Sequence, residues 1–144
     1  MYPPEETYYL AIDPGCSGGF VYQAGATIIS GKNSEIEQLT INKKTVVIIE
    51  RVPTYVGPIP ASSSFKLGYS YGYLVGRFSG YKMHLITPQV WQSFLNIGKK
   101  YEHKNWKARL KDEAIKLFPN QKRITLATAD AYLLLHYALK NKLS

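Results

Sequence analysis

Apolar residues form short continuous runs in the first half of the chain and longer runs with helical spacing in the second half. Three short runs, Tyr8–Asp13, Gly19–Tyr22 and Ala26–Ile29, are separated by turn residues and predict a β-meander. Thr45–Glu50 is an unbroken, β-branched run, which indicates a strand buried on both faces. Met83–Ile86 predicts one more short strand.

The remaining apolar residues predict helices. A polar stretch before residue 45 contains one short amphipathic piece, Ile36–Ile41. Later segments repeat their apolar residues with a period near 3.6, which is typical of helices packed on a core. These predicted helices span Ala61–Phe78, Gln89–Leu95, Asn105–Phe118 and Ala127–Leu139.

The helix predicted over Ala61–Phe78 begins near serines that are available as N-caps, and it presents three stripes. Glycines inside a helix each cost roughly 0.5–1 kcal/mol, so we expect another backbone to approach the glycine stripe closely. That backbone is either the sheet or a second copy of the same helix, and both are compatible with a homodimer. The stripes are Leu67, Tyr71, Leu74, Val75 and Phe78; Phe65, Tyr69 and Tyr73; and Gly68, Gly72 and Gly76.

Length and composition bound the class of protein. A chain of 144 residues with 45% hydrophobic residues is expected to form one domain over residues 1–144. No run approaches the ~20 apolar residues of a membrane span, and the first residues lack the positive charge of a secretion signal. The single Cys16 forms no internal disulfide, which agrees with a reducing compartment. We therefore expect a cytoplasmic protein that does not associate with membranes.

The net charge of +8 is concentrated in the middle of the chain. Residues 51–123 hold 13 basic residues against three acids. A positive charge of this size favours nucleic acid as a partner, although a solvated basic surface accounts for it equally well.

Three carboxylates occupy unusual positions. Asp13 and Glu50 each end an apolar strand, and Asp130 lies near the start of an apolar helix. Burying ionised carboxylates is unfavourable unless a cation or hydrogen-bond donors compensate, so each acid either caps its own element or joins the others around a cation. If the three converge, they form a site for Mg²⁺, which prefers carboxylate oxygens.

The sequence resembles the RuvC-like Holliday junction resolvases, most closely the small forms found in bacteriophages. The resemblance covers nearly the whole chain, in order and at compatible spacings. The motifs that carry it are AIDPG from Ala11, VVIIERV from Val46, FKLGYSYGYLVG from Phe65, ITPQVWQSFL from Ile86, KARLKDEAIKLFP from Lys107 and ADAYLLLHYAL from Ala129.

The resemblance implies a ribonuclease H-like α/β fold, with a mixed sheet of about five strands flanked by helices. It also implies a two-fold homodimer in which each active site cuts one strand of a four-way or branched DNA junction and leaves 5′ phosphates. Asp13, Glu50 and Asp130 match metal-binding acids of the family. The expected cofactor is Mg²⁺, for which Mn²⁺ would substitute, with two ions in each active site.

The sequence departs from the family at one position. The family usually has a further acid a few residues before the position of Asp130, but residues 123–129 contain no carboxylate and no imidazole. Thr125 and Thr128 are candidates to hold a metal-bound water, although a hydroxyl does not supply the missing charge. If the protein comes from a bacteriophage, the expected compartment is the cytoplasm of the infected host cell.

The expected DNA contacts are basic residues, because phosphate contacts set affinity without reading bases. Junction preference would then come from the shape of the DNA. The candidates are Lys66, Arg77, Lys99, Lys100, Lys104, Lys107, Arg109 and Lys111.

Three other functions compete with a junction-cutting nuclease. The first is a non-catalytic or weakly catalytic protein that binds DNA junctions, and the second is a related nuclease acting on RNA-DNA hybrid. The third treats Asp13–Gly19 as the phosphate loop of an actin-like sugar kinase or ATPase, but that architecture needs two such domains and the chain is too short.

Overall fold

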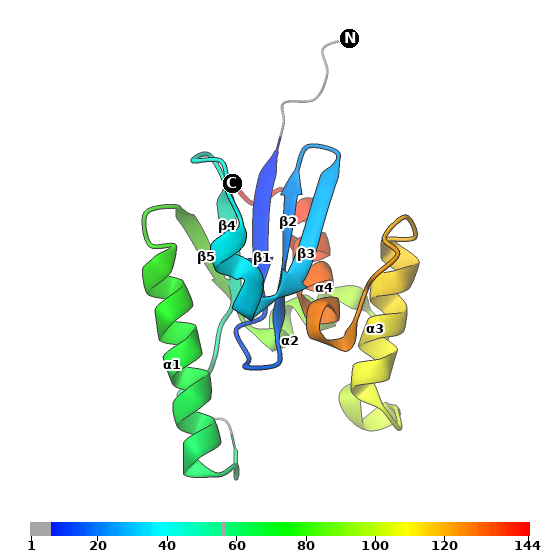
Figure 1. The fold of residues 1–144 in the computed structure, drawn as a ribbon. Coiled ribbons are helices and arrows are strands. Elements are labelled where there is room, and N and C mark those ends of the chain that lie inside the picture. Colours follow the sequence, from blue (N-terminus) through cyan, green and yellow to red (C-terminus); the bar gives the residue numbers. More distant parts are fainter. Residues whose placement is uncertain (1–6, 56) are drawn as a thin grey trace.

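The structure is a computed structural model that describes residues 7–55 and 57–144, and its centre is one mixed sheet in the order β3-β2-β1-β4-β5 (Figure 1). The first three strands form the predicted antiparallel meander, and β1, β4 and β5 run parallel to one another. This arrangement confirms the expected mixed sheet of five strands. The strands are β1 (Tyr8–Ile12), β2 (Gly19–Ala24), β3 (Thr27–Lys32), β4 (Val46–Glu50) and β5 (Lys82–Ile86).

Helices cover both faces of the sheet, and all four predicted α-helices are found. The short amphipathic piece before β4 is a 3-10 helix that begins three residues earlier than predicted and buries Ile36. None of the helices in the described ranges is long and apolar enough to cross a membrane. The helices are η1 (Asn33–Gln38), α1 (Ala61–Arg77), α2 (Pro88–Leu95), η2 (Lys100–Glu102), α3 (Trp106–Leu117) and α4 (Leu126–Lys140).

Alternate residues of the central strands enter two separate apolar clusters. In β1, Ala11 faces the cluster that contains α4, whereas Ile12 faces the cluster that contains η1 and α1. In β4, Ile48 and Ile49 divide in the same way. The unbroken apolar run of β4 is therefore explained by burial on both faces, as predicted.

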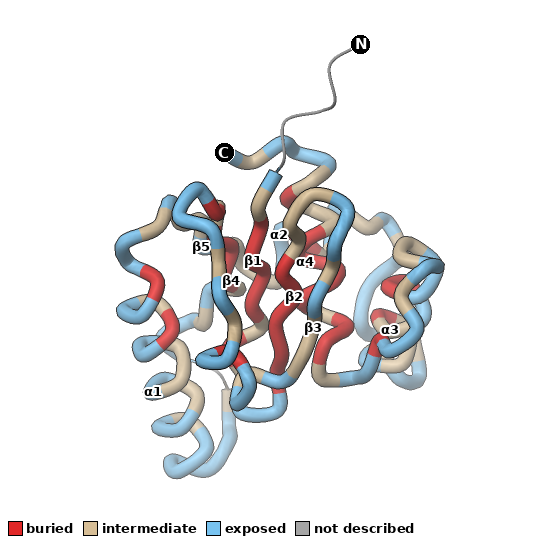
Figure 2. Tube along the Cα trace, turned by 45° about the horizontal axis from the view of Figure 1, so that its top comes forward, coloured by how far each residue is buried: buried red, intermediate tan, exposed pale blue. Residues whose placement is uncertain are grey.

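Helix α1 is attached to the fold by only one of its faces. Leu74 and the following Phe78 are buried against the sheet, but most of the helix is exposed (Figure 2). The predicted serine N-cap is wrong, because Pro60 is the N-cap residue and its carbonyl accepts the Ser63 and Ser64 amide protons.

The glycines of α1 do not pack on the sheet. Gly68, Gly72 and Gly76 are exposed, and a Cβ atom added to any of them would meet nothing within 4 Å. Together with the exposed aromatic residues Phe65 and Tyr69, they form one continuous face of the helix at spacings of three and four residues. Of the two partners expected for the glycine stripe, the sheet is therefore excluded.

Close packing fixes the start of β2. A Cβ atom on Gly19 would lie 2.6 Å from the Gly31 carbonyl oxygen of β3 and 2.7 Å from the Ala127 carbonyl oxygen of α4. Only glycine fits here without displacing backbone, so this residue sets how closely α4 approaches the meander.

We predict that Gly19→Ala lowers the free energy of unfolding by about 1–3 kcal/mol, because the added methyl group overpacks two backbone segments. Urea unfolding followed by circular dichroism measures the change. Gly80→Ala is the control, since a Cβ atom there meets nothing within 4 Å, and its unfolding free energy should stay within about 0.5 kcal/mol of the parent's. Equal stability of the two variants would contradict the packing described here.

Candidate active site

Two carboxylates meet at the carboxyl ends of neighbouring parallel strands. Ile12 is paired with Ile49 in the register of β1 and β4. Asp13 follows Ile12, and Glu50 is the last residue of β4, so the register brings these two acids to the same edge of the sheet. The indole Nε1–H of the fully buried Trp91 donates a hydrogen bond of 2.7 Å to Glu50 Oε2, which orients this side chain.

Helix α4 supplies the third carboxylate, Asp130, from its first turns. The helix begins with a capping box in which the Thr125 and Thr128 side chains each accept a hydrogen bond from the other residue's backbone amide. Neither threonine lines the cavity that contains Asp130. The structure thus places both hydroxyls in the helix cap.

Asp13, Glu50 and Asp130 line one cavity of about 700 Å³. The cavity is bounded by the β1–β2 loop, the end of β4 and the start of α4. Lys107, at the beginning of α3, lines the same cavity although its side chain remains exposed. Lys32, the last residue of β3, lines the cavity as well. Three acids and two lysines from five different segments therefore face a common space.

The electrostatics of the cavity disfavour three ionised acids. Burial and then the charge of Asp13 raise the pKa of Glu50 to about 8, and the same two causes raise the pKa of Asp130 to about 6. Burial also raises the pKa of Asp13. Lys107 opposes these shifts, since its charge lowers the pKa of all three acids. The cavity needs more positive charge to hold the three carboxylates ionised.

The donor set suits a hard divalent cation, but the side chains do not form a closed ligand sphere. Within the described ranges, no group of three or more His, Cys, Asp or Glu side chains is close enough to hold a metal ion as it stands. Carboxylate oxygens are the ligands that Mg²⁺ prefers, and a divalent ion would offset the repulsion that raises the pKa values. The residues fit Mg²⁺ in chemistry, and binding requires the carboxylates to move closer together.

The predicted DNA-contacting residues have different surroundings. Lys107 faces the acidic cavity, whereas Arg77 pairs with Glu37 at 3.3 Å and Arg109 pairs with Glu113 at 3.0 Å. Lys66 lies beside Cys16 and the aromatic residues of α1. Lys111 in α3 is partly buried. The segment before α3 carries three exposed lysines, Lys99, Lys100 and Lys104.

No protein-family model matches the sequence, and no curated protein sequence matches it. Solved structures do match the fold. RuvC of Thermus thermophilus in complex with a Holliday junction substrate aligns with 96% of this chain and 97% of its own, with a TM-score of 0.54 and 14% identity. The chain has a RuvC-like fold. A second structure of Thermus thermophilus RuvC aligns with 94% of this chain and 97% of its own, with a TM-score of 0.53 and 17% identity.

The RuvC-like fold confirms the fold class implied by the sequence motifs, with its mixed sheet flanked by helices. At these identities the likeness concerns the fold and transfers no residue roles. The wall of the cavity one turn before Asp130 consists of Leu126 and Ala127, so no further carboxylate enters from α4.

Sequence patterns did not reveal two features of the site. Lys107 was expected to contact DNA, but its position on the polar side of an amphipathic helix did not place it beside the acids. Trp91 reads as an ordinary core residue, and its bond to Glu50 depends on a contact between residues 41 positions apart. A lysine in the first turn of α3, close in space to three acids, carries no local signal that separates it from neighbouring lysines.

We predict that Glu50→Gln stabilises the metal-free protein at pH 8. The pKa of Glu50 is about 8 in the folded chain against an ordinary value of 4.5, so the parent loses stability as pH rises between these values. The glutamine stays neutral and its side-chain oxygen still accepts the Trp91 proton. Urea unfolding in EDTA at pH 5 and pH 8 tests this, and a variant no more stable than the parent at pH 8 would show that Glu50 is not held in a repulsive site.

Proposed function

We propose that the protein is a metal-dependent endonuclease that cuts four-way or branched DNA junctions, acting as one nuclease domain of residues 1–144. The observation that carries this proposal is the convergence of Asp13, Glu50 and Asp130 with Lys107 in one cavity of a RuvC-like fold. The matching RuvC structure holds a Holliday junction substrate, which supports a DNA junction as the ligand.

In this proposal Asp13, Glu50 and Asp130 hold Mg²⁺ or Mn²⁺, with two ions in each site. When bound there, such ions would supply the Lewis-acid chemistry that phosphodiester hydrolysis needs. The chain itself orients Glu50 through Trp91 and keeps a lysine beside the acids. Lys107 attracts the phosphate of the DNA backbone into a cavity whose carboxylates would otherwise repel it.

Basic residues outside the cavity bind the rest of the DNA. Lys99, Lys100 and Lys104 are exposed on the segment that leads into α3, the helix that carries Lys107. These cations precede the helix that carries Lys107, and their charge would hold the phosphate backbone of one DNA arm. Arg77 and Arg109 would have to exchange their carboxylate partners for phosphates to take part.

The active unit in this proposal is a homodimer formed through α1. Phe65 is 72% exposed and Tyr69 is 70% exposed, beside glycines whose faces are open. Small residues between large aromatic ones allow two helices to approach closely, and a two-fold axis brings the same face of each copy together. Two active sites related by that axis match the two-fold symmetry of a four-way junction.

A second candidate function is a junction-binding protein without cleavage. It is favoured by the absence of a carboxylate one turn before Asp130 and by the open spacing of the three acids. This function keeps the fold, the charge and the dimer but needs no bound metal.

We predict that the protein nicks a synthetic four-way junction symmetrically in Mg²⁺ or Mn²⁺ and leaves the matching linear duplex intact. Asp13→Asn should abolish cutting and preserve or tighten junction binding, because it removes a charge that repels phosphate. Gel assays of cutting and binding measure both, with an RNA-DNA hybrid as a further substrate. Junction binding without cutting in either metal supports the second candidate, and cutting by Asp13→Asn at the parent's rate would refute the metal-binding assignment.

We predict that the parent sediments as a dimer and that Gly72→Arg sediments as a monomer with an unchanged circular dichroism spectrum. Gly72 has open space in the single chain, so arginine disturbs only a partner packed against it. Gly80→Arg is the matched control, since Gly80 is equally open but lies outside α1, and it should remain a dimer. Analytical ultracentrifugation measures the masses, and a monomeric parent would exclude the α1 dimer.

A further inference from the structure

The backbone that carries Asp13 is held by side chains from two distant segments. The Asn33 side-chain amide in η1 donates hydrogen bonds of 2.6 Å to the Asp13 carbonyl and 3.2 Å to the Gly15 carbonyl. The Ser70 hydroxyl in α1 donates one of 2.6 Å to the Pro14 carbonyl. Three consecutive carbonyl groups directly after β1 are therefore each bonded by a side chain.

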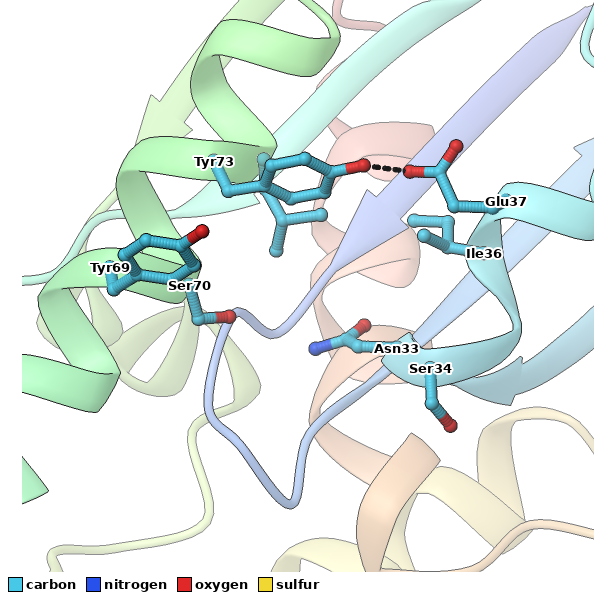
Figure 3. Close-up of a pocket in the computed structure, with 8 residues that line it drawn as sticks. Asn33, Ser34, Ile36, Glu37, Tyr69, Ser70 and Tyr73 are labelled. Atoms are coloured by element: carbon cyan, nitrogen blue, oxygen red, sulfur yellow. Dashed lines mark hydrogen bonds between the residues drawn. The ribbon is translucent and has the colours of Figure 1, made fainter.

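The Asn33 side-chain amide is oriented by its hydrogen bonds to the loop after β1. Its Nδ2 atom points to the loop, and its Oδ1 atom is buried without a hydrogen-bond partner (Figure 3). Rotating the amide by half a turn would place an oxygen against two carbonyl oxygens, which is repulsive. The amide therefore faces the loop with its donor group, which bonds two of the loop's carbonyl oxygens.

The two segments that hold the loop are also joined to each other. The Tyr73 hydroxyl of α1 donates to Glu37 of η1, and the Arg77 Nε–H donates to the same carboxylate at 3.3 Å. A cavity of about 310 Å³ lies between η1 and α1, and Asn33 and Ser70 line it on the side of the loop (Figure 3). The loop is thus held between two braced elements that contribute no acid to the active site.

The loop is also tightly folded on itself. The Gly18 amide donates to the Gly15 carbonyl at 2.9 Å, and the Asp13 amide donates to the Gly19 carbonyl at 2.9 Å. A Cβ atom on Gly18 would lie 2.3 Å from the Asp13 carbonyl oxygen. Because the loop closes directly over Asp13, any movement of its backbone moves the Asp13 carboxylate in the cavity.

We propose that Asn33 and Ser70 are positioning residues: they hold the Asp13–Gly15 backbone and so fix the point from which the Asp13 carboxylate turns toward a metal ion. This inference rests on the proposed function, because it assigns Asp13 to the metal. It adds that two side chains outside the acidic cavity determine how well the cavity binds an ion.

Hydrogen exchange tests whether Asn33 and Ser70, here called the clamp, hold the loop of residues 13–18 in place. In Asn33→Ala the amide protons of Asp13 and Gly18 should exchange about tenfold faster or more, because loss of two hydrogen bonds allows the loop to open. The amide of Ile48, in the central strand β4, should exchange as in the parent. Unchanged exchange at Asp13 and Gly18 would overturn the proposal.

Mn²⁺ titration followed by electron paramagnetic resonance tests whether the clamp positions the ligand, without relying on cleavage. Asn33→Ala should weaken Mn²⁺ binding by at least about fivefold, and faster loop exchange with unchanged Mn²⁺ affinity would also overturn the proposal. If the parent binds no Mn²⁺, the proposed metal site fails, and with it the positioning role. Hydrogen exchange would then still show separately whether the clamp holds the loop.

Matched variants separate these effects from general destabilisation. Ser70→Ala removes one bond and should show the same changes to a smaller extent, whereas Ser70→Thr keeps the hydroxyl and should behave as the parent. Ser63→Ala, at an exposed position of the same helix, controls for Ser70→Ala. Asn141→Ala controls for Asn33→Ala, since the Asn141 amide donates only to Tyr137 at the far end of α4. If Asn33→Ala fails to fold, the Ser70 pair decides the outcome.

Discussion

The parallel pairing of β1 with β4 is the constraint on which the candidate site depends. The register sets Ile12 against Ile49, and each strand is followed or ended by a carboxylate at the same edge. A shift of one residue would reverse the faces of one strand and send its apolar side chains to the wrong cluster. The two clusters that bury both faces therefore fix the register, and the register fixes the distance between the first two acids.

The site brings together three carboxylates, Asp13, Glu50 and Asp130, whose closeness is unfavourable without a ligand. Two of its acids have pKa values raised to about 8 and about 6, and the raised values reflect burial and mutual repulsion. Rigid elements around the cavity maintain this arrangement: the apolar strands, the capped start of α4 and the Trp91 hydrogen bond to Glu50. Acids with raised pKa values that are held close together by a rigid scaffold are typical of functional sites.

The sequence predicted the elements well because each has a strong local pattern. All five strands and the four α-helices lie close to their predicted ranges, and the motifs indicated the fold although overall identity to the matching structures is 14–17%. Asp13, Glu50 and Asp130 were identified because an acid that interrupts an apolar run is conspicuous. Their spacing was not predictable, since it depends on contacts between three distant segments, the β1–β2 loop, β4 and α4.

Other features left no signal in the sequence because they depend on three-dimensional packing. The glycine stripe of α1 reads equally well as a contact with the sheet or with a second copy, and only the orientation of the helix excludes the sheet. Asn33 lies in a polar stretch whose residues look interchangeable, and its role follows from bonds to a loop 18 and 20 positions away. Thr125 and Thr128 looked like candidates for water binding, but the structure uses them as a helix cap.

The position of α4 after all five strands in the chain has a consequence for how the cavity is assembled. The meander is built from neighbouring segments and needs only short loops to close, whereas the acidic cavity joins residues 13, 50 and 130. Bringing together residues so far apart in sequence costs loop-closure entropy, which slows the step that completes the cavity. During synthesis from the N-terminus, β1 and β4 can pair and bring Asp13 and Glu50 to one edge before α4 exists, so the cavity remains open on one side until α4 docks. A nascent chain would therefore carry the basic residues proposed to contact DNA, such as Lys99, Lys100 and Lys104, before the acidic cavity is complete.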